Sequence, residues 1–235
     1  MADAESPTNA TTDWIARYID AQVNVLRALD PGPIAAVIEL LGRLRTEGRQ
    51  LFVCGNGGSA SNASHFANDL GKSASDALVA KELPAGSGAK DATTPNAPTP
   101  AGQMTAEASA GGDAQAHRFR VLSLNDNIAW LTAIANDYAY EDIFLRQLEN
   151  YAQPGDALLA ISVSGNSPNI VKATDWANRH GLCTLAITGK GRGALADLAQ
   201  HPLILDDTHF GRVEDVSMTI LHLLCYHWME NSIAL

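Results

Sequence analysis

The stretch LFVCGNGGSASNASHFANDLGKS, residues 51–73, carries the strongest information about the fold. An apolar run at 51–54 ends in a turn of glycine, asparagine and serine at 55–59, and a helix-like segment follows. A short continuous apolar run is typical of a strand that is buried on both faces. Glycine permits the positive φ angles and close backbone approach of a tight turn. The stretch therefore predicts a strand–turn–helix unit whose helix carries His65 and Asp69 one turn apart.

Four further apolar runs, at 120–124, 157–162, 183–188 and 202–206, predict strands of the same kind. Helix-like segments separate most of them. Two amphipathic helices are expected before the first strand, over 14–29 with Asp13 as N-cap and over 34–48, and a long helix is expected over about 213–233. Strands that alternate with helices form a parallel sheet covered on both faces. We expect one domain, residues 1–235, built as a three-layer α/β sandwich around a five-stranded, mostly parallel sheet.

Two segments do not fit this pattern. Residues 74–116 are rich in Ala, Gly, Pro, Ser and Thr and contain no aromatic residue. Such a composition predicts a loosely ordered insertion within the domain. It would serve either as a tolerated surface insertion or as a lid or docking segment, because it leaves the helix that carries His65 and Asp69. Residues 1–10 are expected to form a flexible N-terminus.

Charge and composition narrow the class of protein. The 235 residues include 26 acidic and 16 basic side chains, for a formal net charge of −10. An excess of negative charge disfavours binding to nucleic acid or to an anionic membrane surface. No apolar run approaches the roughly 18 residues of a membrane span, and no signal peptide is expected. The cysteines, Cys54, Cys183 and Cys225, are predicted to be buried free thiols, so we expect a cytoplasmic protein.

Two strand-to-helix turns have the character of anion sites. The first is GNGGSAS, where Ser59 or Ser61 is expected to cap the following helix. The second is ISVSGNSPNIVKA at 161–173, where Ser167 is the expected cap and Pro168 occupies the favoured first helical position. A helix N-terminus offers unpaired N–H groups to an anion. Neither turn contains the lysine of a nucleotide-binding P-loop, which favours a phosphate monoester. The alternative is that both are plain strand-to-helix connections.

The chain resembles the sugar isomerase (SIS) family. The resemblance is carried by GNGGSASNASHFANDL, SLNDN, TAIANDYAYEDIF, PGDALLAISVSGNSPNIVKA, TLAITGKGRGALADLA and FGRVEDVSMTILHLLC. It covers nearly the whole chain except residues 1–10 and 74–116. Within the family the motifs are most similar to the phosphoheptose isomerases, which convert sedoheptulose 7-phosphate to D-glycero-D-manno-heptose 7-phosphate.

The resemblance implies a flavodoxin-like fold, aldose–ketose isomerisation, one zinc ion per site and a homotetramer with active sites at subunit interfaces. It also implies a set of substrate-binding residues. These are Asn56, Gly57, Gly58 and Ser59 in the first turn, Asn125 and Asp126 after the second strand, Ser162, Val163 (through its backbone), Ser164 and Ser167 in the second turn, and Glu214.

The resemblance further implies that His65, Asp69, Glu214 and His222 bind the metal and that Asp69, Glu214 and His222 take part in catalysis. Asp69 stands where the family has Glu, and Glu214 stands where it has Gln, so either carboxylate could be the base. Glu214 and His222 would lie about 12 Å apart along a straight helix. The rival hypothesis is a non-catalytic SIS module that senses phosphosugars or binds another protein, which the two altered positions favour and the two histidines disfavour.

Overall fold

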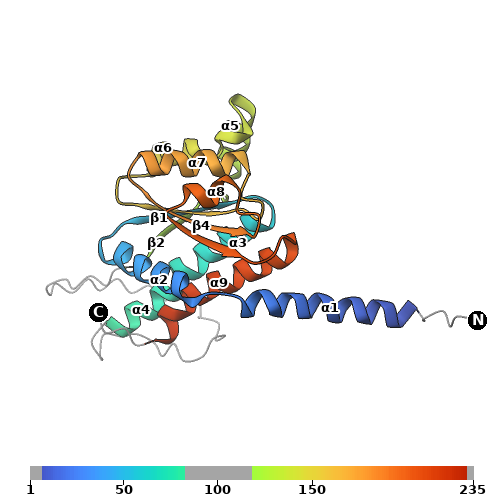
Figure 1. Cartoon of the computed structure of the whole chain (residues 1–235). Helices are drawn as coiled ribbons and strands as arrows, with labels where there is room; N and C mark the ends of the chain where they lie inside the picture. The colour runs from blue at the N-terminus through green and yellow to red at the C-terminus, as the bar shows by residue number, and fades with distance from the viewer. Residues whose placement is uncertain (1–6, 83–117, 232–235) are drawn as a thin grey trace, which may run out of the picture.

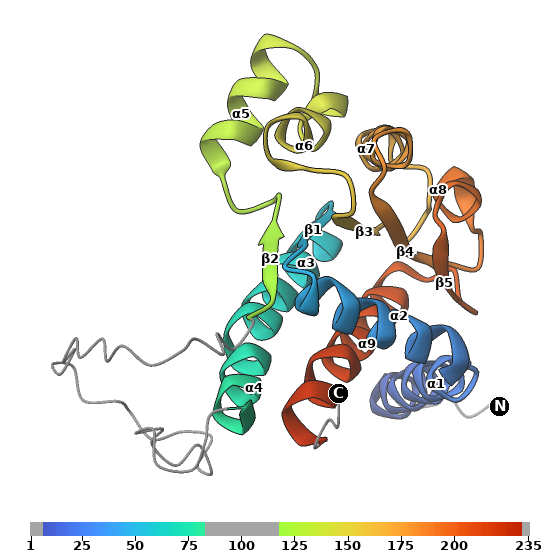
Figure 2. The ribbon, with the colours of Figure 1, turned by 90° about the vertical axis from the view of Figure 1, so that its left-hand side faces the viewer.

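The computed structural model describes residues 7–82 and 118–231. One parallel sheet in the order β2-β1-β3-β4-β5 lies at its centre (Figure 2). The strands are β1 (Gln50–Gly55), β2 (Arg120–Ser123), β3 (Ala157–Ile161), β4 (Cys183–Gly189) and β5 (His201–Leu205). This order is that of flavodoxin-like folds, and it confirms the predicted five-stranded α/β architecture.

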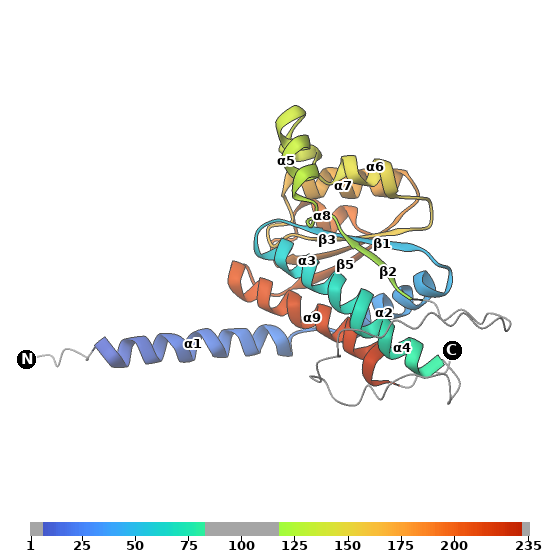
Figure 3. The same ribbon diagram turned by 180° about the vertical axis from the view of Figure 1, so that it is seen from behind.

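Helices cover both faces of the sheet and complete three layers (Figure 1). One face carries α2 (Pro31–Thr46), α3 (Gly58–Asn68), the π-helical segment η1 (Asp69–Ala74), α4 (Ser75–Glu82) and α9 (Phe210–Glu230). The other face carries α5 (Ile128–Asp137), the 3₁₀ turn η2 (Tyr140–Asp142), α6 (Leu145–Tyr151), α7 (Pro168–Arg179) and α8 (Gly193–Leu198). Figure 3 shows α3 and α4 running beside α9.

Strand β1 shows why the apolar runs become central strands. Successive side chains of a strand point to opposite faces. Leu51 and Val53 enter the core beneath α2, α3 and α9, whereas Phe52 and Cys54 enter the core beneath α5, α6 and α7. All four are at most 3% exposed. The expectation of burial on both faces fails at β2, where Leu122 is 40% exposed, because β2 is an edge strand with a neighbour on one side only.

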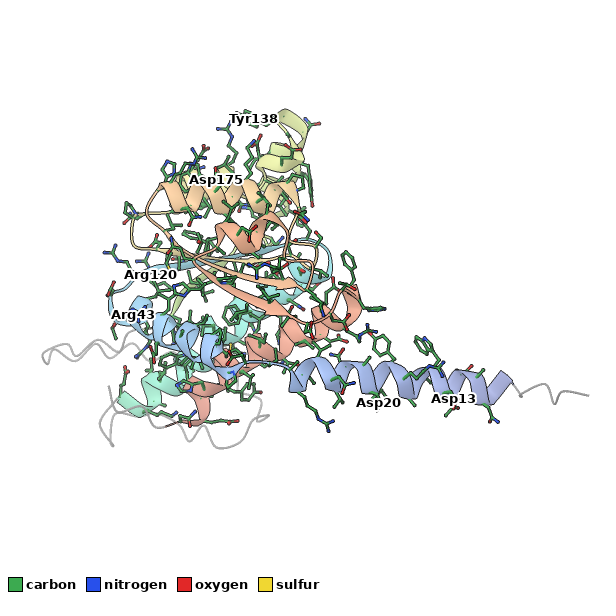
Figure 4. All side chains as sticks on the ribbon, in the orientation of Figure 1. Asp13, Asp20, Arg43, Arg120, Tyr138 and Asp175 are labelled. Carbon is green, nitrogen blue, oxygen red and sulfur yellow. The ribbon has the colours of Figure 1, made fainter. Side chains whose placement is uncertain are left out.

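The first helix begins earlier than expected and stands away from the body. Helix α1 spans Pro7–Arg27, so residues 7–10 are helical and Asp13 lies inside the helix instead of capping it. Figures 1 and 4 show α1 extending from the rest of the molecule, with Asp13 and Asp20 on the projecting part. Residues 1–6 lie outside the described residues. No helix in the described ranges combines the length and hydropathy needed to cross a bilayer.

The predicted insertion is also shorter than expected at its start. Residues 75–82 form α4, in which Leu78 is buried. The Lys81 ammonium donates hydrogen bonds to three carbonyl groups at the end of α9, those of Trp228, Met229 and Asn231, at 2.8–3.1 Å. Glu82 forms an ion pair with the buried Arg45. These tertiary contacts order a segment whose composition suggests a loop. The rest of the predicted insertion, residues 83–116, lies outside the described residues.

A partly buried ion pair at the start of α9 contacts the middle of α1. Arg212 donates to both carboxylate oxygens of Asp207, at 2.5 and 3.0 Å. The Arg212 guanidinium also lies 5.5 Å from the ring centre of Tyr18 on α1. The Arg212 hydrogen bonds, with a further bond from the backbone N–H of His209, lower the pKa of Asp207 to about 2. The charged carboxylate is therefore the form that the folded chain stabilises.

We predict that Asp207→Asn lowers the free energy of unfolding at pH 7 by about 1–2 kcal/mol. A carboxyl group whose pKa falls from 3.8 to about 2 on folding stabilises the fold above pH 4, and this contribution disappears as the pH falls towards 2. Urea unfolding at pH 7 and pH 3 measures the difference. The neighbouring Asp206 pairs with Lys190 on the surface, so Asp206→Asn is the matched control and should change little. Equal losses for the two variants would contradict the assignment.

Candidate active site

In doubly wound sheets a crevice forms beyond the carboxyl ends of the strands, at the point where the strand order reverses. Here that point lies between β1 and β3. The chain leaves β1 at Gly55 towards α3 on one face, and it leaves β3 at Ile161 towards α7 on the other face (Figure 2). The two turns predicted to bind an anion, 55–59 and 162–167, therefore lie side by side.

We call residues 162–167 the serine loop. The Gly165 N–H donates to the carbonyl of Ser162 at 3.0 Å, and Gly165 has a φ of 66° that favours glycine. The hydroxyls of Ser162 and Ser167 lie 3.2 Å apart. The hydroxyl of Ser164 accepts from the N–H of Asn166 at 3.2 Å, so its own proton is available to a ligand. Pro168 begins α7 as predicted, but Ser167 does not cap the helix with its side chain.

The serine loop and the first turn enclose a small cavity of about 80 Å³. It is lined by Asn56, Ser59, Ile161, Ser162, Val163, Ser164, Ser167, Phe210 and Glu214. At about 30 Å³ for a water molecule, the cavity has room for a group of a few heavy atoms. None of these lining residues is Lys or Arg, so hydroxyl and backbone groups are the donors that it offers to an anion. Phe210, which is 61% exposed, was not among the predicted site residues.

A side chain at Gly58 would displace the Glu214 carboxylate. It is the first residue of α3, and a Cβ atom there would lie 2.4 Å from a carboxylate oxygen of Glu214. The Glu214 carboxylate thus lies over the N-terminus of α3, where the helix dipole favours negative charge. Gly57, with a φ of 56°, occupies the N-cap position, and no side chain caps α3. The predicted caps Ser59 and Ser61 instead lie within the helix.

Two residues that sequence reasoning missed connect the turns. Asn169 on α7 is 1% exposed, and its side-chain amide pairs with that of Asn56 at 2.9 Å in both directions. The Tyr140 hydroxyl donates to Asn56 Oδ1 at 3.1 Å. Asn169 follows the serine loop at the second position of α7, and a polar residue there, beside a predicted anion site, is the signal that could have identified it.

Asn125 and Asp126 lie at the carboxyl end of β2. The Asn125 side chain accepts from the N–H of Gly55 at 3.2 Å and donates to its carbonyl at 2.8 Å. Asp126 accepts from the hydroxyl of Ser64 on α3 at 2.5 Å. Neither residue lines the 80 Å³ cavity. Asn125 therefore supports the first turn from behind, and Asp126 lies beside α3.

His65, Asp69 and His222 form a cluster that we call the histidine cluster. Their side-chain ligand atoms all lie within 4.8 Å of one another. Asp69 Oδ2 is 3.1 Å from His65 Nε2 and 3.8 Å from His222 Nε2, and the two Nε2 atoms are 3.1 Å apart. Both histidine side chains are nearly half exposed. A contact between two Nε2 atoms needs one of them to carry a proton, whereas a cation would satisfy both lone pairs.

Cys225 is the cysteine whose pKa is affected by Asp69 of this cluster. Burial and the Asp69 carboxylate raise the pKa of Cys225 to about 12. The thiol is therefore protonated at neutral pH, and its sulfur is not among the clustered ligand atoms. Cys54 is fully buried in β1, and burial likewise raises its pKa. The donors available at the cluster are imidazole nitrogen and carboxylate oxygen.

Within the single chain the structure does not bring Glu214 into the histidine cluster, in keeping with its expected separation of about 12 Å from His222 along the helix. Helices α3 and α9 lie side by side, and Asn62 Nδ2 donates to the Glu214 carbonyl at 2.9 Å. We call the line of contact between these two helices the α3–α9 seam. Along it, Glu214 lies beside Gly58, and His222 lies beside His65. Eight residues of helix separate Glu214 from His222, or about 12 Å. The seam thus joins the phosphate-sized cavity at one end to the histidine cluster at the other.

Comparison with known proteins identifies the family. A family model described as SIS domain matches residues 99–189. The probable phosphoheptose isomerase of Thermoplasma volcanium is 30% identical over 211 residues, which cover 90% of this chain and 88% of the relative. The phosphoheptose isomerase of Trichlorobacter lovleyi is 31% identical, with 90% of both chains covered. The chain belongs to the phosphoheptose isomerase family.

The fold agrees with this membership. The phosphoheptose isomerase structure from Neisseria gonorrhoeae superimposes with a TM-score of 0.70 over 94% of this chain and 97% of that one, at 22% identity. The phosphoheptose isomerase family therefore shares the sheet and the helical layers described above. At that level of identity the superposition concerns the fold alone.

Proposed function

We propose that the chain is an aldose–ketose isomerase that interconverts sedoheptulose 7-phosphate and D-glycero-D-manno-heptose 7-phosphate. The observation that carries the proposal is the α3–α9 seam, which has a hydroxyl-lined cavity bordered by the Glu214 carboxylate at one end and an imidazole–carboxylate cluster at the other. The first suits a phosphate group, and the second suits proton transfer beside a carbonyl. Curated relatives at 30–31% identity are named phosphoheptose isomerases.

The length of the seam supports a long sugar phosphate. The two ends lie about 12 Å apart along the helices. In an extended seven-carbon sugar phosphate, with C–C bonds of about 1.5 Å, the phosphorus lies roughly 10 Å from the carbonyl carbon. A phosphate in the serine loop would therefore place C1 and C2 beside Asp69 and His222. A triose phosphate would end well short of the histidine cluster.

Asp69 is the proposed acid–base group, and His222 takes part in proton transfer only in the metal-free protein. A base removes the proton from the carbon next to the carbonyl, an enediol forms, and the proton is returned to the neighbouring carbon. Asp69 has one oxygen towards the histidines and a second oxygen, Oδ1, which accepts from Asn68 Nδ2 at 3.1 Å. Glu214 lies at the phosphate end of the seam, so we assign it to orienting the sugar chain and not to the proton transfer.

The donor set of the histidine cluster fits zinc. Zinc in enzymes is bound by imidazole and carboxylate groups, with three protein ligands and an open position. His65, Asp69 and His222 would hold the ion, and their partial exposure leaves a side open to substrate. When bound, zinc polarises a carbonyl oxygen and stabilises negative charge on it. Histidine nitrogens that bind the ion no longer carry protons, which leaves Asp69 Oδ1 as the base in the metal-loaded protein.

We also propose a homotetramer whose active sites border subunit interfaces. Trp14, Ile15 and Ile19 on the projecting helix α1 are 45–58% exposed in the single chain. Leu223 and Tyr226, next to His222 on α9, are also nearly half exposed and line a groove of about 380 Å³ with Ile34 and Ile38 of α2. A second copy that covers these apolar surfaces would border the histidine cluster. The tetramer is the assembly that the family resemblance implies.

The proposed compartment is the cytoplasm. Cys54, Cys183 and Cys225 are free thiols in the structure. Cysteines remain unpaired in reducing compartments, in which phosphosugar metabolism takes place.

The activity is tested with purified protein, sedoheptulose 7-phosphate and a panel of shorter ketose phosphates, with aldose formation followed by NMR. We predict turnover of the seven-carbon substrate above the others. Asp69→Asn should reduce kcat by about 10²–10⁴-fold and change KM little. Asp175→Asn, which alters an exposed pair with Arg179, is the control. Tight binding of the phosphosugar without conversion, in any metal state, would favour a sensor or adaptor instead.

Metal binding is tested by elemental analysis and by zinc titration calorimetry of chelator-treated protein. We predict about one zinc ion per chain, and loss of both signals in His65→Ala because one of three ligands is removed. His180→Ala is the matched control, since His180 stacks on Trp176 at the surface of α7. Full zinc binding by the His65 variant would show that the cluster is not the metal site.

Assembly is tested by multi-angle light scattering. A tetramer is expected for the wild-type chain. Replacing Ile15 and Ile19 with Asp would place charge in the proposed interface, so the variant should dissociate and lose activity, whereas Ile15→Leu should preserve both. A wild-type monomer that is fully active would refute the interface proposal.

A further inference from the structure

We propose that Asn166 is a positioning residue that sets the affinity of the site for the phosphate group of its substrate. The inference rests on the proposed phosphosugar function and extends it to a residue outside the cavity. Asn166 does not line the cavity. It acts through Ser164, which lines the cavity, and through the turn that precedes α8.

Three hydrogen bonds place Asn166 between the serine loop and α8. Its backbone N–H donates to Ser164 Oγ at 3.2 Å, and its side-chain Nδ2 donates to the Ser164 carbonyl at 3.2 Å. Its Oδ1 accepts from the N–H of Ala194 at 3.0 Å. The first bond occupies an acceptor lone pair of the Ser164 hydroxyl and leaves the O–H as a donor. The other two hold the loop in the conformation that aims this donor.

The support behind the serine loop is conformationally strained. The N–H of Gly193 donates to the carbonyl of Gly191 at 2.7 Å. This three-residue turn is centred on Arg192, whose φ of 60° and ψ of −58° make it a classic γ-turn, a rare and strained conformation. Arg192 is the single described non-glycine residue with positive φ. Strain of this kind persists where the surrounding structure over-determines the backbone.

The strained turn contacts the serine loop backbone to backbone. A Cβ atom on Gly165 would lie 2.0 Å from the Arg192 carbonyl oxygen, and a Cβ on Gly193 would lie 2.4 Å from the Gly165 carbonyl carbon. The N–H of Leu195 donates to the Gly165 carbonyl at 2.9 Å. Asn166 adds the side-chain link across this contact. We infer that the turn holds the serine loop in place before substrate arrives.

Preorganisation matters here because the cavity has no basic side chain. Neutral donors bind an anion well when they already point at it and need no reorganisation. Loss of the Asn166 amide would free the Ser164 carbonyl and the Ala194 N–H while leaving every lining residue unchanged. The expected consequence is weaker binding of the phosphate group with the fold and the histidine cluster intact.

The experiment compares Asn166→Ala with Asn178→Ala. Asn178 provides a matched control, because its Nδ2 donates to the Leu198 carbonyl at 2.8 Å and also links α7 to α8, at the end away from the cavity. Calorimetry measures the Kd of inorganic phosphate and of sedoheptulose 7-phosphate, with unphosphorylated sedoheptulose as a third ligand. Thermal melting and steady-state kinetics are measured on the same samples.

We expect Asn166→Ala to raise the Kd of phosphate and the KM of the phosphosugar by about 5–10-fold, the effect of one or two weakened hydrogen bonds. Its affinity for unphosphorylated sedoheptulose should not change, and kcat should stay within about 3-fold. Asn178→Ala should lower the melting temperature at least as much and leave the phosphate Kd unchanged.

Equal phosphate affinity in the wild type and Asn166→Ala would overturn the positioning role alone. The same loss in Asn178→Ala, or an equal loss for phosphorylated and unphosphorylated sugar, would also overturn it, because the effect would then be one of general stability. A wild-type protein that binds neither phosphate nor the phosphosugar would overturn the proposed function itself.

Discussion

The register of α3 against α9 is the constraint on which the whole site depends. Asn62, which is 9% exposed, donates to the Glu214 carbonyl and so joins a side chain of one helix to the backbone of the other. Gly58 permits the close approach of the Glu214 carboxylate one turn earlier. With these two contacts in place, His65 and His222 meet about two turns beyond Gly58 and Glu214. A shift of one residue in either helix would rotate one histidine by about 100° away from the other.

The sheet determines where this helix pair begins. Because β1 and β3 are adjacent and parallel, their carboxyl ends bring the first turn and the serine loop together, and α3 starts from that edge. The order of the strands in the sheet positions the cavity, whereas the packing of α3 against α9 positions the histidine cluster. The two are coupled because α3 belongs to both. The proposed proton transfer would take place about 12 Å from the cavity along the helices.

Much of this arrangement could be predicted from local sequence patterns. The apolar run through Phe52, the Gly-Ser turns and the helical spacing of His65 and Asp69 report on neighbouring residues, and they predict the strand, the turns and the helical segment. The predicted serine caps do not form, and Asp69 begins the π-helical segment η1. Contacts between distant segments were harder to predict. Helix α4 depends on Lys81 and Glu82 reaching α9 and α2, which its composition does not reveal. The amide pair of Asn56 and Asn169 spans 113 residues, whereas the separation of Glu214 from His222 already follows from helix spacing. The assignment of catalytic, substrate and metal roles stays a prediction.

The most direct test of the account is a crystal structure of the protein with zinc and sedoheptulose 7-phosphate, recorded at the zinc absorption edge. We predict phosphate density against Ser162, Ser164 and Ser167, and an anomalous peak among His65, Asp69 and His222. We also predict that C1 and C2 of the sugar lie beside Asp69. A phosphate group bound away from the serine loop, or an anomalous peak at other residues, would contradict the account.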